Sequence, residues 1–204
     1  MKKFFLNLLC LTFAIFSLVT CTSTSTGGSG TTTPTKTWDN YAIGDTGPSG
    51  GFIFYINPNA ATDGWKYLEA SPSSGEATKN WGKETVLVDT TKYDIGSGTQ
   101  NTLDIIAKDN TTDKAADYCA NYSITNNSVV YDDWFLPSNN ELLLMRTNLY
   151  QSGIGSFATL YSVIYWASSE IDNQYAKCVI FTTGASSGAA KYHFKHAVRP
   201  CRKF

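Results

Sequence analysis

The sequence predicts an α+β domain with mixed or antiparallel sheets and two main helices. Residues 52–56 form a continuous apolar run, as in a buried strand, and later segments alternate with a period of two. Apolar residues within 115–122 and after Ser138 recur at helical spacing instead. Hydrophobic residues make up 42% of the 204-residue chain, which is enough for one domain-sized core.

The first twenty residues predict export. Residues 1–20 have a basic start and an apolar stretch that suits a signal peptide but is short for a membrane span. They lead into Leu18-Val19-Thr20-Cys21, which resembles a bacterial lipobox with Thr20 in place of the usual Gly, Ala or Ser. We therefore expect lipidation of Cys21 and anchoring to the bacterial outer membrane at the cell surface. An ordinary cleaved signal and an uncleaved anchor are the alternatives.

Composition separates a tether from a folded domain. Residues 21–37 are rich in Ser, Thr and Gly and lack apolar residues to bury, so we expect a flexible tether before a domain at 38–204. The net charge of the whole chain is -1, and loss of Lys2 and Lys3 with the signal leaves 14 basic against 17 acidic residues. This balance argues against nucleic acid as a partner, and it leaves the lipid anchor as the expected membrane contact.

The first half of the domain begins with a glycine-rich turn at 43–51 before the strand at 52–56. Asp63-Gly64 is a hairpin signal, and residues 65–70 then alternate like a half-buried strand. Residues 71–101 are polar and predict mostly loop.

Helices are expected in the middle of the domain. Residues 102–108 predict a short helix, and 115–122 place four apolar residues on one helical face. Ser138 and Glu141 fit a capping box at the start of the next helix, which ends before Gly153.

The last fifty residues predict β-structure. Strands are expected at 161–168 and 175–182, with a turn at 184–188. Residues 191–199 then alternate, which would place Lys191, His193 and Lys195 together on one face of a strand.

Two C-terminal segments are candidates for ligand binding. A tryptophan edge beside hydroxyl, carboxylate and amide groups could bind a sugar by stacking and hydrogen bonding, and the alternative is a core tryptophan. The candidates are Trp166, Ser168, Ser169, Glu170, Asp172 and Asn173. Lys191, His193 and Lys195 form a basic edge that could meet sulfate or carboxylate groups. Its alternative role is to guard an edge strand against aggregation.

Metal, cofactor and catalytic signals are weak. Asp132 and Asp133 supply too few oxygens for calcium and fit better as a turn, so we expect no metal. No nucleophile elbow, zinc-protease or phosphate-loop motif occurs, and the sequence predicts no cofactor and no catalytic residue. Beyond Cys10 and Cys21, three cysteines remain at 119, 178 and 201, which allow one disulfide and a thiol, or no disulfide.

Several motifs occur together in one order. They are 44–51 (GDTGPSGG), 64–70 (GWKYLEA), 95–98 (IGSG), 133–138 (DWFLPS), 165–170 (YWASSE) and 198–200 (VRP). Over residues 41–204 this set resembles the Lcl C-terminal domain family, which is named after a collagen-like bacterial adhesin. The resemblance implies a fold related to C-type lectin-like and formylglycine-generating-enzyme-like domains. The adhesin that names the family is associated with sulfated glycosaminoglycans.

The resemblance also implies a disulfide and a function. By analogy with C-type lectin-like domains it implies a Cys119–Cys201 bridge with Cys178 as a buried thiol. A Cys178–Cys201 bridge and no disulfide are the alternatives. We expect a lipid-anchored surface protein that binds an extracellular glycan, a sulfated polyanion or a protein ligand, with an oligomer allowed by analogy. A structural or protein-interaction lipoprotein is the alternative, and a sulfatase-modifying type of enzyme comes third.

Overall fold

A computed structural model of the protein describes residues 40–89, 91–158 and 163–204. These residues belong to one compact unit, Trp38–Phe204. The predicted signal segment at 1–20, the tether at 21–37 and the lipidation site Cys21 lie outside the described residues. Within the described part, no helix has the length and apolar character needed to cross a membrane.

The domain is a mixture of helices and mainly antiparallel strands, as predicted. The helices are α1 (Ala60–Asp63), α2 (Gly98–Lys108), α3 (Ala115–Asn121) and α4 (Asn139–Asn148), with single 3₁₀ turns at Ser73–Gly75 and Tyr150–Ser152. The strands are β1 (Phe52–Ile56), β2 (Tyr67–Ala70), β3 (Ala77–Lys79), β4 (Ile124–Asn126), β5 (Val129–Tyr131), β6 (Ile164–Glu170), β7 (Tyr175–Ile180), β8 (Ser186–Ala190), β9 (His196–Val198) and β10 (Cys201–Lys203).

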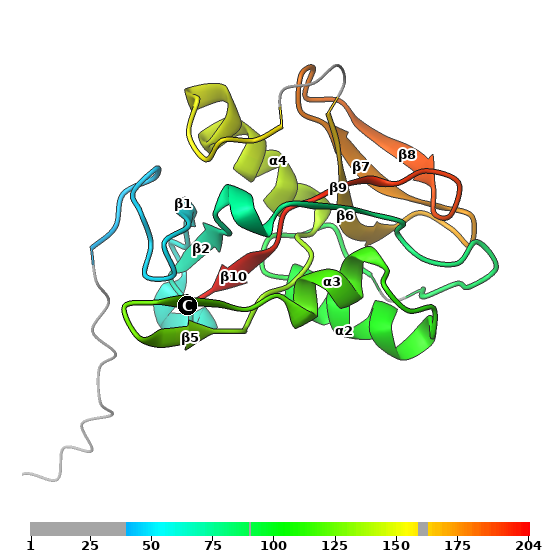
Figure 1. The fold of residues 1–204 in the computed structure, drawn as a ribbon, viewed down its shortest axis with the longest axis horizontal. Coiled ribbons are helices and arrows are strands. Elements are labelled where there is room, and N and C mark those ends of the chain that lie inside the picture. The colour runs from blue at the N-terminus through cyan, green and yellow to red at the C-terminus, as the bar shows by residue number, and fades with distance from the viewer. Residues whose placement is uncertain (1–39, 90, 159–162) are drawn as a thin grey trace, which may run out of the picture. The chain divides into compact units, whose positions relative to one another are not determined.

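The strands form three sheets. One sheet has the order β1-β2-β10, a second has the order β3-β9-β6-β7-β8, and β4 and β5 form a separate hairpin. Strand β9 pairs with β6 in parallel, whereas the other described pairs are antiparallel. The end of the chain, red in Figure 1, passes from β9 in the second sheet to β10 in the first, so it joins the two sheets.

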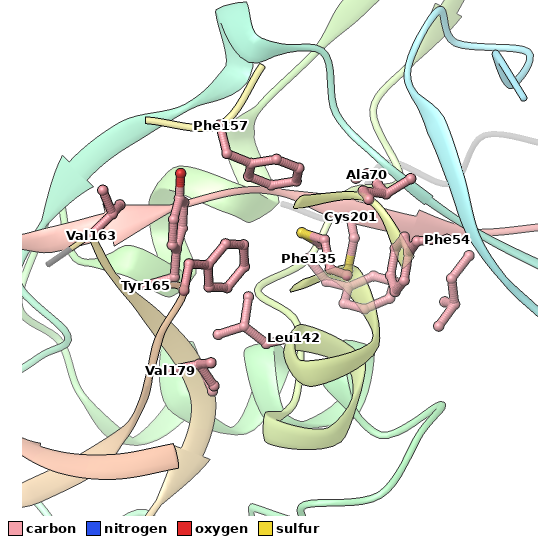
Figure 2. Close-up of a cluster of buried hydrophobic side chains, with 14 residues drawn as sticks. Phe54, Ala70, Phe135, Leu142, Phe157, Val163, Tyr165, Val179 and Cys201 are labelled. Atoms are coloured by element: carbon pink, nitrogen blue, oxygen red, sulfur yellow. The ribbon is translucent and has the colours of Figure 1, made fainter. Parts of the chain in front are cut away.

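Both faces of the five-stranded sheet are covered. Tyr165 of β6 and Val179 of β7 belong to a hydrophobic cluster that includes Leu142 of α4, and Figure 2 shows these side chains gathered beside the helix. Trp166 and Cys178, the alternate residues of the same strands, belong to a second cluster with residues of α2 and α3. Successive side chains of a strand point to opposite faces, so burial on both faces explains why the first four residues of β6 are all apolar.

Helix α4 begins with the predicted capping box. The Ser138 hydroxyl accepts a hydrogen bond from the backbone N–H of Glu141 at 3.3 Å. The Glu141 carboxylate accepts in return from the backbone N–H of Ser138 at 2.7 Å and from that of Gly96 at 2.7 Å. Burial raises the pKa of Glu141, although hydrogen bonds from Ser138 and Gly96 oppose the rise.

A buried carboxylate ties the first sheet to distant loops. Glu69 of β2 is fully buried and accepts hydrogen bonds from the backbone N–H groups of Ser49 and Gly51, at 3.1 and 3.0 Å. It also pairs with Arg202 of β10 at 3.1 Å, and Arg202 in turn pairs with Asp133 through two nitrogens. These contacts engage both carboxylate oxygens of Asp133 with Arg202.

The predicted strand at 191–199 is mostly wrong. Residues 191–193 form a turn, and only His196–Val198 pairs as a strand, β9. The predicted turn at 184–188 instead runs into β8, which pairs with β7 over Ser186–Ala190. The alternation of residues 191–195 predicted an exposed Lys191, but its side chain is buried against Glu170, as described below.

The disulfide implied by the resemblance is not formed in this structure, and the pairing stays a prediction. Cys119, Cys178 and Cys201 are all free and buried, with Cys201 in the cluster beside α4 and the other two in the cluster beside α2 and α3. Burial raises the pKa of all three thiols, that of Cys178 to about 11, because a thiolate is poorly solvated in an apolar core. Such thiols are unreactive.

We therefore expect three masked thiols in the domain 38–204. An alkylating reagent should label none of them in the native domain and all of them after denaturation without reductant, as counted by intact mass. Only a single alkylated thiol in the denatured, unreduced protein would show that one disulfide had formed.

Candidate functional site

Four of the predicted ligand-binding residues are buried in β6, so this part of the prediction is wrong. The Trp166 ring is fully buried, and its Nε1 donates to the backbone oxygen of Lys79 at 2.9 Å. The Ser168 hydroxyl accepts from the Asn101 amide at 3.0 Å. The Ser169 hydroxyl donates to the backbone oxygen of Lys92 at 2.8 Å. These groups bond to β3, to α2 and to the loop at Lys92, and their burial keeps them from an external ligand.

The loop after β6 is exposed, but its Asp172 side chain stabilises the turn that the loop itself forms. One carboxylate oxygen of Asp172 accepts hydrogen bonds from the backbone N–H groups of Gln174 and Tyr175, at 2.8 and 2.7 Å. Asn173 is exposed in the same turn. Neither Asp172 nor Asn173 lines the cleft described below, so the two halves of the predicted site are not brought together.

Lys191 is buried rather than displayed on a basic edge. Its relative exposure is 0%, and its ammonium forms an ion pair with Glu170. The same ammonium donates to the backbone oxygen of Val86 at 2.9 Å and lies 4.8 Å from the centre of the Trp81 ring. A buried lysine needs such partners because desolvation of an unpaired ammonium is very costly.

The Glu170–Lys191 pair anchors two loops. Glu170 accepts hydrogen bonds from the backbone N–H groups of Val88 and Asp89, at 2.9 and 2.8 Å. The backbone oxygen of Lys191 accepts from the N–H of Trp81 at 2.9 Å. The pair therefore fixes both the loop after β3 and the turn at 191–195 from their buried sides.

The other two members of the predicted basic edge, His193 and Lys195, are exposed but have different partners. His193 pairs with Glu84 through Nε2 at 2.9 Å, and the His193 side chain is 65% exposed. Lys195 is exposed and faces Asp113, whose pKa is lowered mainly by a hydrogen bond and the charge of Lys79, with a smaller effect from Lys195. The predicted edge thus contributes only Lys195 to the cleft.

Three adjoining hollows form one surface cleft, which we call the Tyr192 cleft. The central hollow shares Thr111 and Tyr192 with one neighbour and Thr112 and Asp113 with the other, and the volumes are about 190, 440 and 640 Å³. These volumes suit a small organic ligand or a short oligomer built from small units. The lining residues are Lys79, Asn80, Gly82, Lys83, Glu84, Thr85, Asn110, Thr111, Thr112, Asp113, Lys114, Asp117, Tyr118, Asn121, Tyr122, Ser123, Tyr192 and Lys195.

The floor of the cleft depends on a close approach between two loops. A Cβ at Gly82 would lie 2.4 Å from a carboxylate oxygen of Asp109, so only glycine fits there. Asp109 accepts from the backbone N–H groups of Lys83 and Thr111, at 2.7 and 2.9 Å. Burial raises the pKa of Asp109, but these hydrogen bonds and the charge of Lys114 outweigh it and lower the pKa overall.

Tyr192 is displayed over the cleft on a fixed backbone. The residue is 59% exposed, and its backbone oxygen accepts a hydrogen bond from the Asn80 amide. The preceding residue, Lys191, is also fixed, because its backbone N–H donates to the backbone oxygen of Gln174 at 3.0 Å. The far end of the cleft carries two more rings, Tyr118 and Tyr122.

The described lining of the cleft offers hydrogen-bonding groups, charged groups and aromatic rings to a ligand. The three described thiols are buried, and no cluster of metal-ligating side chains occurs in the described ranges. Sequence reasoning missed Asn80, Thr111, Asp113 and Tyr192. The polar run at 110–113 before α3 was the available signal, but nothing local indicates that it meets the turn at 191–195.

Breaking the buried ion pair should destabilise the protein strongly. Glu170→Gln would leave the Lys191 ammonium buried without its counter-charge, so we expect the free energy of unfolding to fall by about 3–5 kcal/mol in urea titrations. The control is Glu84→Gln, which breaks the exposed pair with His193 and should cost less than about 1 kcal/mol. Equal losses for the two variants would contradict this assignment.

His196 should make the fold sensitive to acid. Its ring lies between Trp166 and Phe194, with centroids 4.6 and 6.1 Å away, and burial lowers the pKa of His196 below its usual 6.5. The unfolded chain therefore takes up a proton at a higher pH than the folded protein, so stability is lost as pH falls below about 6.5. We would measure the unfolding free energy at pH 7.5 and 5.5, about one unit above and below the usual histidine pKa. The decrease between these two pH values should be smaller in His196→Gln than in the wild type. An equal decrease in both proteins would refute the prediction.

Comparisons with known proteins bear on the fold. No protein-family model matches the sequence, and no curated protein matches it. The fold is similar to that of a fimbrial protein from Bacteroides ovatus, with a TM-score of 0.50 and 14% sequence identity. The match covers 76% of this chain and 44% of the fimbrial protein, so the chain spans less than half of that protein's length. At this identity the likeness concerns the fold alone.

Proposed function

We propose that this protein is a lipid-anchored bacterial surface protein that binds an extracellular ligand in the Tyr192 cleft. The observation that carries the proposal is the exposed Tyr192 ring, which stands over a joined set of polar hollows on a backbone anchored by the buried Glu170–Lys191 pair. A pre-positioned aromatic group at a concave polar surface is a common feature of binding sites, because little ordering is needed when the ligand arrives.

Display at the surface rests on the sequence of residues 1–37. In this proposal Cys21 carries the lipid, and residues 22–37 lead to the domain. The fold likeness to a protein described as fimbrial agrees with a surface role. The proposed outer-membrane location would place the cleft within reach of glycans and proteins outside the cell.

We also propose that the domain belongs to the Lcl C-terminal, C-type lectin-like group that its motifs resemble. Support comes from the place of the motifs in the fold, since three of them join one network in which Arg202 links Asp133 to the buried Glu69 carboxylate. Glu69 accepts hydrogen bonds from Ser49 and Gly51, and its partner Arg202 pairs with Asp133. Residues that share such a network are the ones that a common fold would retain.

A second candidate function is protein interaction through a different surface. Val129 and Val130 are 49% and 59% exposed at the β4–β5 hairpin, where apolar side chains favour contact with another protein. A sulfatase-modifying type of enzyme has less support, because burial raises the pKa of Cys178 to about 11 and leaves no activated thiolate.

The proposal predicts that binding depends on Tyr192. The soluble domain 38–204 contains both hydrophobic clusters and can be applied to an array of neutral glycans, sulfated glycans and extracellular matrix proteins. Tyr192→Ala should weaken the observed binding by at least about tenfold, through loss of an aromatic contact at the centre of the site. Tyr175→Ala removes a tyrosine that is 43% exposed outside the cleft, and this control should bind like the wild type.

Two results would contradict the proposal. One is the absence of binding to every component of the array. The other is binding that Tyr192→Ala leaves unchanged while the variant is folded by circular dichroism. The second result would move the binding function to another surface, for which a Val130→Ser variant at the β4–β5 hairpin is the next test.

A further inference from the structure

We infer that the ligand of the Tyr192 cleft is a neutral oligosaccharide and not a sulfated polyanion. This inference rests on the proposed function and specifies the chemistry of its ligand. It follows from three properties of the cleft, which are its division into adjoining hollows, the kinds of side chain that line it and the balance of its charges.

Aromatic rings line separate hollows of the cleft. Tyr192 lines the central hollow and one of its neighbours, whereas Tyr118 and Tyr122 line the hollow on the other side. Because the hollows share Thr111, Thr112 and Asp113, one chain of linked units could contact rings in more than one of them. A single ion or a compact ligand would leave most of this surface unused.

The lining is polar apart from its tyrosine rings. Among the described residues that line the cleft, none is aliphatic, and hydroxyl, amide and charged groups lie between the rings. A lipid or an apolar peptide side chain would find no aliphatic pocket here. A sugar matches the surface better, since its C–H face can lie on a ring while its hydroxyls exchange hydrogen bonds with groups such as Asn80 and Thr111.

The charges of the cleft nearly cancel. Its lysines are Lys79, Lys83, Lys114 and Lys195, and its carboxylates are Glu84, Asp113 and Asp117. Lys79 is paired with Asp113 and Lys114 with Asp117, at 2.7 Å for the second pair. The described residues form no salt bridge to Lys83 or Lys195, so these two are the lysines left for an anion.

A sulfated chain would therefore meet only two unpaired lysines, Lys83 and Lys195, and would lie beside three carboxylates. The side chain of Asp113 is 75% exposed at its centre, and Glu84 is engaged with His193 at one end. Like charges placed together across an interface disfavour binding. The lysine on which polyanion binding would depend most, Lys191, is buried against Glu170 and faces away from solvent.

Tyr192 is suited to stacking because its ring has few competing contacts. In the described part of the chain its hydroxyl has no hydrogen-bond partner, and its ring makes only a distant edge contact with His193, with centroids 6.3 Å apart. The backbone below the ring is fixed by Asn80 and by the partners of Lys191. The ring can therefore meet a ligand at small cost in conformational entropy.

The inference is tested by calorimetric titration of domain 38–204. The probes are neutral tetrasaccharides of glucose, galactose, mannose and N-acetylglucosamine, together with heparin, each at about 50 and about 500 mM sodium chloride. We expect at least one neutral probe to bind, with an affinity that changes less than about twofold with salt, because no net charge is neutralised. Tyr192→Ala should weaken this binding at least about tenfold, whereas Tyr192→Phe retains the ring and should stay within about threefold of wild type.

The other outcomes separate the inference from the proposed function. Binding of heparin alone, with steep salt dependence and loss in Lys195→Glu, would overturn the neutral-saccharide inference and leave a Tyr192-dependent binding function intact. Failure of every saccharide, with Tyr192-dependent binding to a matrix protein on the array, would overturn it in the same way. Saccharide binding that is equal in wild type and Tyr192→Ala would overturn both the inference and the proposed site.

Discussion

The ion pair between Glu170 and Lys191 is the constraint on which the candidate site depends. Both side chains are buried, and removing them from water carries a large desolvation cost that must be offset locally. The offset comes from their mutual attraction, from the Val86 carbonyl and Trp81 ring around the ammonium, and from two backbone N–H groups at the carboxylate. Because every one of these partners lies in a loop or a turn, the pair sets the path of irregular segments that the sheets alone would leave undefined.

The same principle extends through the cleft. Asp109 binds the backbone on both sides of the cleft floor and excludes any side chain at position 82, while Asn80 holds the carbonyl of Tyr192. The cleft is thus built from loops that are secured by buried polar groups behind them. This arrangement allows an exposed aromatic ring to be pre-positioned on a surface that is otherwise hydrophilic, which is what a binding site for a polar ligand requires.

Local patterns predicted the elements that depend on local chemistry. The strand at 52–56, a strand within 65–70 and the capping box of α4 occur near where their apolar spacing and cap residues indicate. The second of these strands, β2, is buried throughout and not half-buried as predicted. The site could not be predicted this way. Lys191 follows a pattern typical of an exposed strand, and only its meeting with Glu170, 21 residues earlier, draws it into the core. Likewise, the cleft joins segments near 80, 111 and 192, whose proximity becomes visible only in the folded chain. The resemblance to a family implied a disulfide, whereas the three cysteines of the described domain are free and buried in this structure.

Amide hydrogen exchange tests most directly whether the buried pair holds the site together. The amides of Val88 and Asp89, which bond to Glu170, and that of Trp81, which bonds to the carbonyl of Lys191, should be protected nearly as well as the core strands. In Lys191→Met these three amides should lose protection while those of β6 and β7 keep theirs. Fast exchange of all three amides in the wild-type protein, at the rate of exposed loops, would contradict the view that this pair fixes the loops and displays Tyr192.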